Sequence, residues 1–129
     1  MASQLFPKGA ENILEGNAIF GTHNFKVLFY SGAITTTWEF HSSLTGGSII
    51  ATSGNLTIDT NTPGNGVVDA ANITITAVSG SAFTHVILFR DTGTSATSPL
   101  ICVWDVASFT PTGGDVNVVF NASGLFSIA

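Results

Sequence analysis

The first hydrophobic pattern along the chain is helical. Four apolar residues follow the spacing i, i+4, i+7 and i+8, which places them on one helical face: Phe6, Ala10, Ile13 and Leu14. Pro7 suits the first turn of a helix, and Gly16 offers a left-handed stop. We therefore predict a short helix within residues 1–16, with an extended arm that orders against a neighbour as the alternative.

After Gly16 the pattern changes to short strands separated by turn residues. The expected strands cover residues 25–30, 35–40, 48–58, 67–78, 83–90, 99–106, 115–120 and 125–128. Residues 48–58 form one strand or a pair broken near 53–55, and residues 61–66 form a turn cluster. Within residues 35–40, Trp38 and Phe40 alternate with Glu39.

These elements predict a mainly β fold with one short N-terminal helix. Strands at this spacing, with no helical crossovers between them, indicate an antiparallel β-sandwich or jelly roll of about seven to nine strands. With 129 residues and no long linker, the chain is expected to form a single domain over residues 1–129, of which 1–16 are the helix or arm.

Composition narrows the class of protein further. Charged residues make up only 9% of the chain, against about 25% in an average soluble domain, and the mean hydropathy is +0.43. Disorder is excluded, because disordered chains are polar and rich in charge. The apolar runs are much shorter than the roughly 18 residues that a membrane-spanning helix needs, and the first residues do not resemble a signal peptide.

The charge balance argues against nucleic acid and membranes as partners. The formal net charge is −5, and the only lysine and arginine residues are Lys8, Lys26 and Arg90. Binding to phosphates or to anionic lipid surfaces needs several cations. Cys102 is the only cysteine and stands in an apolar strand, so we expect a buried thiol and a reducing cytoplasm.

The low charge also favours self-association. The sequence has 30 serine and threonine residues where a typical surface would carry mixed charge. The cores of protein interfaces are depleted of charge, so oligomerisation or docking onto a larger assembly is expected.

One short motif resembles a catalytic signature. Residues 91–95 read Asp-Thr-Gly-Thr-Ser after an apolar strand, as in aspartic proteases, where two aspartates share a proton. Three features oppose this interpretation. Only about 38 residues follow Asp91, its neighbour Arg90 is a cation, and residues 94–99 form an ordinary small-residue turn. We therefore expect a turn residue and no catalytic activity.

No other group of residues predicts a catalytic, metal or cofactor site. Asp59, Asn61 and Gly64 resemble the start of a calcium loop, but Pro63 replaces a ligand and a closing glutamate is missing. His23, His41 and His85 do not have the spacing of a metal site, and no nucleophile elbow occurs. Trp38, Trp104 and Tyr30 could stack on sugars, although core positions are more common for such residues.

Several segments resemble one group of viral proteins. Residues 4–14 (QLFPKGAENIL), 25–28 (FKVL), 90–101 (RDTGTSATSPLI) and 118–126 (VVFNASGLF) are similar to the small structural proteins of tailed bacteriophages. Residues 35–80 match this group least well. The resemblance implies a virion-associated protein made in the cytoplasm of the bacterial host.

Within that group, small acidic β-rich proteins serve as capsid decoration or cement proteins. The resemblance therefore implies a trimer that binds the exterior of the capsid and clamps adjacent copies of the major capsid protein. The alternative is a neck, tail or fibre component, with a glycan-binding sandwich as one variant. In either case we expect the apolar N-terminal residues Leu5, Phe6, Ile13 and Leu14 to be the candidate interaction residues.

Overall fold

The computed structural model describes residues 3–20, 22–64, 67–120 and 126–127. Their elements, in chain order, are β1 (Ser3–Leu5), α1 (Pro7–Leu14), β2 (Phe25–Ser31), the 3-10 turn η1 (His41–Ser43), β3 (Ser48–Thr52), β4 (Ile58–Gly64), β5 (Val67–Ala70), β6 (Ile73–Ile75), β7 (Phe83–Arg90), the 3-10 turn η2 (Ser95–Thr97), β8 (Leu100–Phe109), β9 (Val116–Val118) and β10 (Phe126–Ser127). The expected mainly β fold with one short helix is confirmed.

A five-stranded antiparallel sheet forms the centre of the molecule. Its strand order is β1-β8-β7-β2-β3, so the two most apolar strands, β2 and β7, lie side by side. Their pairing runs without a break from Phe25 opposite Arg90 to Tyr30 opposite His85. The predicted bounds 25–30 and 83–90 agree closely with these two strands.

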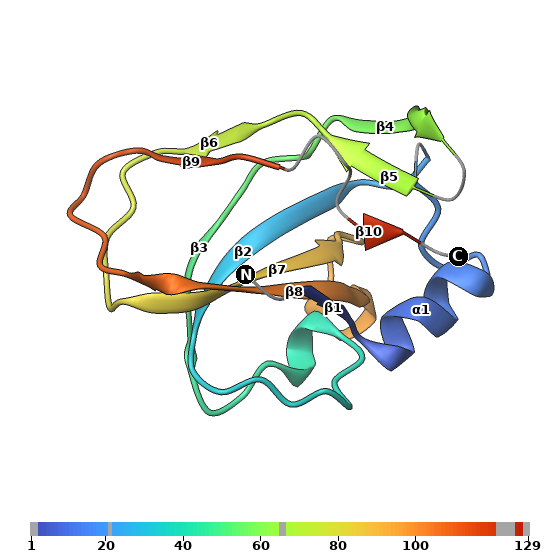
Figure 1. Cartoon of the computed structure of the whole chain (residues 1–129). Coiled ribbons are helices and arrows are strands. Elements are labelled where there is room, and N and C mark those ends of the chain that lie inside the picture. Colours follow the sequence, from blue (N-terminus) through green and yellow to red (C-terminus); the bar gives the residue numbers. More distant parts are fainter. Residues whose placement is uncertain (1–2, 21, 65–66, 121–125, 128–129) are drawn as a thin grey trace.

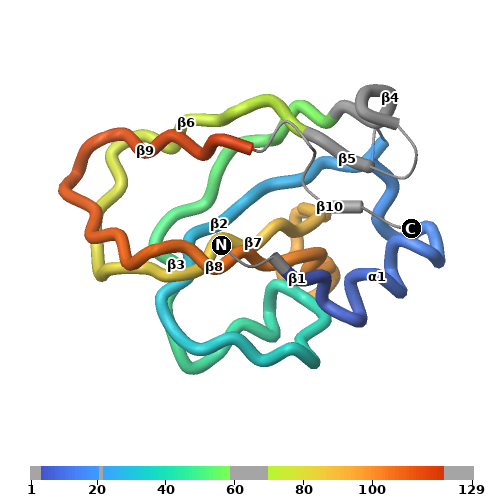
Figure 2. Tube along the Cα trace, in the orientation of Figure 1, coloured from blue at the N-terminus to red at the C-terminus, as the bar shows by residue number. Residues whose placement is uncertain are grey.

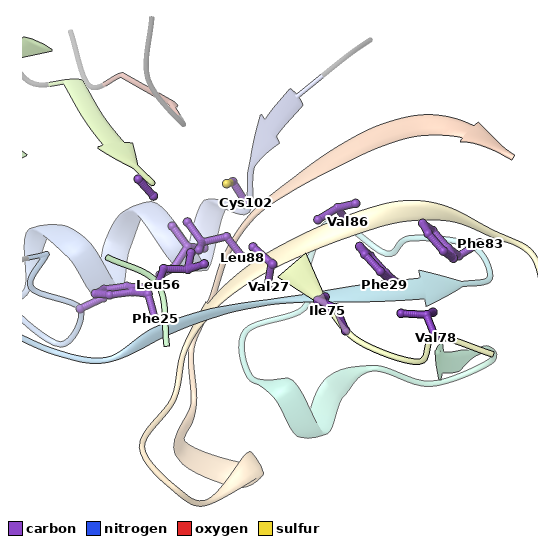
Figure 3. Packing of buried hydrophobic residues seen from close by; sticks show 13 residues of the cluster. Phe25, Val27, Phe29, Leu56, Ile75, Val78, Phe83, Val86, Leu88 and Cys102 are labelled. Carbon is purple, nitrogen blue, oxygen red and sulfur yellow. The ribbon is translucent and has the colours of Figure 1, made fainter. Parts of the chain in front are cut away.

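A second layer covers one face of this sheet. It consists of the antiparallel sheet β10-β5-β4 and the pair β6-β9; Figure 1 shows β4, β5, β6 and β9 along the top of the molecule. The two layers enclose a cluster that we call the inner core, part of which Figure 3 shows. Its buried members are Ala18, Phe25, Val27, Phe29, Leu56, Ala70, Ile75, Val78, Phe83, Val86, Leu88, Ile101 and Cys102. The rings of Phe29 and Phe83 stack there, with centroids 4.2 Å apart.

The opposite face of the central sheet is also covered. In Figure 2 the cyan and teal part of the tube, between β2 and β3, passes beneath the sheet. It closes a second cluster, the outer core, formed by Phe6, Leu28, Tyr30, Trp38, Ile87, Phe89, Leu100 and Val103. Alternate residues of β2 point into the two cores, which explains why Val27 to Tyr30 are all buried.

The predicted strand at residues 35–40 is wrong. Only Phe40 makes a bridge, to Pro99, and the Trp38 N–H closes a turn on the Thr35 carbonyl. Around that bridge the Leu100 N–H donates to the Glu39 carbonyl and the His41 N–H donates to the Ser98 carbonyl, both at 2.8 Å, whereas the residues before Glu39 cross the sheet face without strand pairing. Alternation of apolar and polar residues indicates that one side of a segment is buried. Here the burial comes from Trp38, whose ring packs edge-on against Tyr30 with ring centroids 5.8 Å apart.

The second layer also differs from the prediction in detail. β4 continues through Gly64, so residues 61–64 of the predicted turn cluster belong to a strand. The register between β4 and β5 is irregular between Asp59 and Gly64, and such bulges tolerate turn-forming residues. The predicted strand 67–78 is divided into β5 and β6, which belong to different sheets, and the 48–58 alternative resolves into β3 and β4.

The N-terminal segment forms the predicted helix, and Gly16 adopts the expected left-handed conformation, with φ of +82°. The sequence did not predict β1, which pairs with β8 immediately before the helix. Gly9 lies where α1 meets β8. A Cβ atom at Gly9 would approach the carbonyl oxygens of Leu100 and Ile101 to 2.5 and 2.6 Å, so only glycine allows this close contact.

Candidate functional site

The loop that follows β7 contains the Asp-Thr-Gly motif and is held by its own side chains. Thr92 Oγ1 lies 2.7 Å from Thr97 Oγ1 and 3.0 Å from Ser98 Oγ. The Thr92 N–H donates to Ser98 Oγ at 3.0 Å, and that hydroxyl donates to the Thr94 carbonyl at 2.8 Å. Ser98 is buried, so this network fixes the shape of the loop from inside.

Asp91 anchors the start of the same loop. Its Oδ1 accepts the Gly93 N–H at 2.9 Å, and its Oδ2 lies 2.7 Å from Lys26 Nζ on β2. The hydrogen bond from Lys26, followed by that from Gly93, lowers the pKa of Asp91. A shared-proton dyad needs a carboxyl group that keeps its proton, and this arrangement favours the ionised form. The geometry is that of a turn residue tied to the neighbouring strand.

An open pocket of about 190 Å³ lies beside this ion pair. Five parts of the chain supply its lining: Lys26 of β2, His41 of η1, Thr52 of β3, Phe89 at the end of β7, and Asp91, Gly93, Thr94, Ser95 and Ser98 of the loop. The rings of His41 and Phe89 pack edge-on, with centroids 5.0 Å apart. Burial lowers the pKa of His41, so its imidazole is neutral at pH 7.

Sequence reasoning identified Asp91 and considered His41 separately, but it did not bring them together. The turn motif gave no indication that Lys26 would be the ionic partner, because Lys26 is 65 positions away and reaches Asp91 only through the pairing of β2 with β7. The wrong strand assignment at residues 35–40 also concealed His41. His41 follows the segment that crosses the sheet face, and from this position its imidazole lines the pocket.

The other histidines and the cysteine have structural surroundings. His85 Nε2 lies 3.2 Å from Asp105 Oδ1 across the β7–β8 pair, and its Nδ1 lies 3.0 Å from Thr84 Oγ1. His23 Nδ1 accepts the Ile19 N–H at 2.9 Å and so closes a turn. Cys102 is buried as predicted, and burial raises the pKa of its thiol.

The metal hypotheses receive no support from the described residues. Within those residues, no three or more His, Cys, Asp or Glu side chains gather in a way that could hold a metal ion. The side chains of the calcium-loop candidate, Asp59, Asn61 and Gly64, lie outside the part of the chain whose side chains are described. Trp38 is buried, whereas Trp104 is half-buried beside Phe120.

The four predicted interaction residues have different surroundings. Phe6 is 1% exposed and belongs to the outer core, while Leu5 and Ile13 are partly buried against the inner core. Leu14, at the end of α1, has 78% of its surface exposed. The apolar stripe therefore contributes three side chains to the protein's own cores and leaves Leu14 available for contact.

All three lysine and arginine side chains are engaged within the chain. Lys8 pairs with Glu11 at 3.2 Å on the exposed side of α1, and Lys26 pairs with Asp91. Arg90 Nη1 donates to the Asn17 carbonyl at 2.7 Å and fixes the loop after α1 against the end of β7. Each of the three cations therefore has a partner within the chain.

The comparisons with known proteins give no match: no protein-family model fits the chain, and neither a curated protein nor a solved structure is significantly similar to it. Among the described residues, no helix is long and apolar enough to cross a membrane.

Proposed function

We propose that the protein is a structural component of a phage virion, and specifically a capsid decoration protein that binds the outside of the shell. The proposal rests on the sequence resemblance of residues 4–14, 90–101 and 118–126 to small phage structural proteins. The exposed apolar side chains of the protein support a role in assembly.

The observation that carries the proposal is the exposure of large apolar side chains on a chain with very little charge. In the part of the chain that the structure describes, the large apolar residues that are at least 40% exposed are Leu14, Ile19, Ile49, Phe109 and Val119. The whole chain has only three lysine or arginine residues, and each is engaged within the fold. Contact with other subunits would remove this apolar surface from water, and interface cores are depleted of charge in the same way.

The chemistry of the described residues supports the same class of function. Asp91 is an ion-paired turn residue, Cys102 is buried, and the hydroxyl network of the loop holds the loop itself. A domain with few charges and many hydroxyl groups suits a protein that is present in many copies and makes modest contacts with each capsid subunit. The proposed partners are a second and third copy of the chain, as a homotrimer, and the major capsid protein.

Leu14 provides a direct test by co-sedimentation with undecorated capsids. The Leu14→Ser variant should keep its melting temperature, because the side chain is 78% exposed, and should lose capsid occupancy or trimer formation. Glu15→Ser is the matched control, since it changes a neighbouring exposed residue without removing apolar surface. Unchanged capsid binding by Leu14→Ser would remove α1 from the proposed interface.

Wild-type protein that neither binds capsids nor forms an oligomer at high concentration would contradict the proposed function as a whole. Binding to isolated tails or necks in place of capsids would favour the neck, tail or fibre alternative.

A further inference from the structure

The pocket beside Asp91 has more hydrogen-bonding capacity than the protein itself uses. Lys26 has three N–H donors, of which the ion pair with Asp91 occupies one. The hydroxyl groups of Thr52 and Ser95 and the ring nitrogens of His41 make no hydrogen bond within the described part of the chain. Four polar side chains from β2, η1, β3 and the loop therefore face one pocket with free donors and acceptors.

The electrostatics of the pocket select against charged ligands. Its only ionised side chains are Lys26 and Asp91, which neutralise each other at 2.7 Å. His41 contributes no charge at pH 7, because burial lowers its pKa. An anion would meet the Asp91 carboxylate, and a cation would meet the Lys26 ammonium group. A neutral ligand can use both groups without breaking their pairing.

The lining combines groups that match a polyhydroxylated ring. Each hydroxyl group of a sugar can both donate and accept a hydrogen bond. The side chains of Thr52, Ser95 and His41, which make no hydrogen bond within the described part of the chain, can do the same. Phe89, which is only 4% exposed and packs edge-on against His41, forms the apolar floor of the pocket. A volume of about 190 Å³ leaves room for one small ring within the pocket.

We propose that the pocket formed by Lys26, His41, Thr52, Phe89, Asp91 and Ser95 binds a single neutral sugar ring. The loop supports this assignment, because the contacts between Thr92 and Ser98 join its two ends and the Gly93 N–H holds the Asp91 carboxylate before any ligand arrives. The sugar site does not depend on the proposed role in the virion and can be tested on the isolated protein.

The test is a ¹H–¹⁵N NMR titration of the full chain with glucose, galactose and N-acetylglucosamine. Phosphate and glycine serve as the anionic and zwitterionic comparison ligands. We expect saturable shifts confined to the amides of Lys26, Thr52 and residues 91–98 with at least one sugar, at a dissociation constant of about 1–10 mM. Such an affinity is ordinary for a small, open and polar site.

Three variants then locate the binding site. His41→Phe keeps a ring against Phe89 and removes the ring nitrogens, and Ser95→Ala removes one free hydroxyl; each should weaken sugar binding about fivefold or more at an unchanged melting temperature. Ser42→Ala changes an exposed neighbour of His41 outside the pocket and should bind as the wild type does. The proposal is overturned if no sugar gives saturable shifts, if phosphate or glycine binds more tightly, or if both pocket variants bind normally.

Discussion

Replacing Gly9 with alanine tests how closely α1 must approach the central sheet. In an exposed helix this change is stabilising by about 1 kcal/mol, because alanine is the better helix former. Gly9 is buried, however, and an added Cβ would lie 2.5 Å from the Leu100 oxygen, 2.6 Å from the Ile101 oxygen and 2.9 Å from the Ile101 Cα. All three are backbone atoms of β8, so no side chain can rotate away.

The helix itself would have to move, and its attachments oppose that movement. The Phe6 N–H donates to the Ile101 carbonyl at 2.9 Å, and the Phe6 side chain is only 1% exposed. Overpacking typically costs about 1–3 kcal/mol, and exposing Phe6 would add about 1.5–3 kcal/mol. After the gain in helix propensity is subtracted, we expect Gly9→Ala to lower the free energy of unfolding by about 2 kcal/mol or more.

Urea unfolding followed by circular dichroism measures this difference. Gly54→Ala is the matched control, because a Cβ at Gly54 has no heavy atom within 4 Å and its stability should change by less than about 0.5 kcal/mol. A Gly9→Ala protein that is as stable as the wild type, or more stable, would refute the close contact between α1 and β8.

Three further predictions concern the loop, a strand junction and the thiol. Lys26 holds the pKa of Asp91 below its ordinary value of 3.8, so their pair stabilises the fold above that pH and is lost as the pH falls through the folded-state pKa. Asp91→Asn should therefore be less stable than the wild type at pH 6, and the difference should shrink as the pH falls below 3.8, as urea unfolding at a series of pH values would show. Ser53→Ala should cost about 1–3 kcal/mol in thermal or urea unfolding, because the buried Ser53 hydroxyl accepts the Val27 N–H at 3.0 Å. Cys102 should resist a thiol reagent in the native protein and react in urea, whereas rapid native labelling would contradict its burial.

The strands that could be predicted from the sequence are those whose burial leaves a simple pattern. β2 and β7 are continuous apolar runs because both of their faces are covered, and their predicted bounds were nearly correct. The helix was predictable because its apolar spacing, Pro7 and Gly16 are all local signals.

What remained hidden depends on contacts between distant parts of the chain. β1 is three residues long and exists because β8 offers it a free edge, which no local pattern records. The strand assigned to residues 35–40 failed because alternation does not show whether a pairing partner exists. The pocket was missed for the same reason, since Lys26, His41 and Asp91 meet only after the sheet has formed and the crossing segment has covered its outer face.

The number of copies of the protein in a purified phage particle tests the proposed function most directly. Quantitative mass spectrometry of intact virions, with the major capsid protein as the internal standard, gives this ratio. A decoration protein should be present in a fixed ratio to the capsid protein, on the order of hundreds of copies per particle. About six or twelve copies would place the protein in the neck or tail, and its absence from the particle would contradict a structural role in the virion altogether.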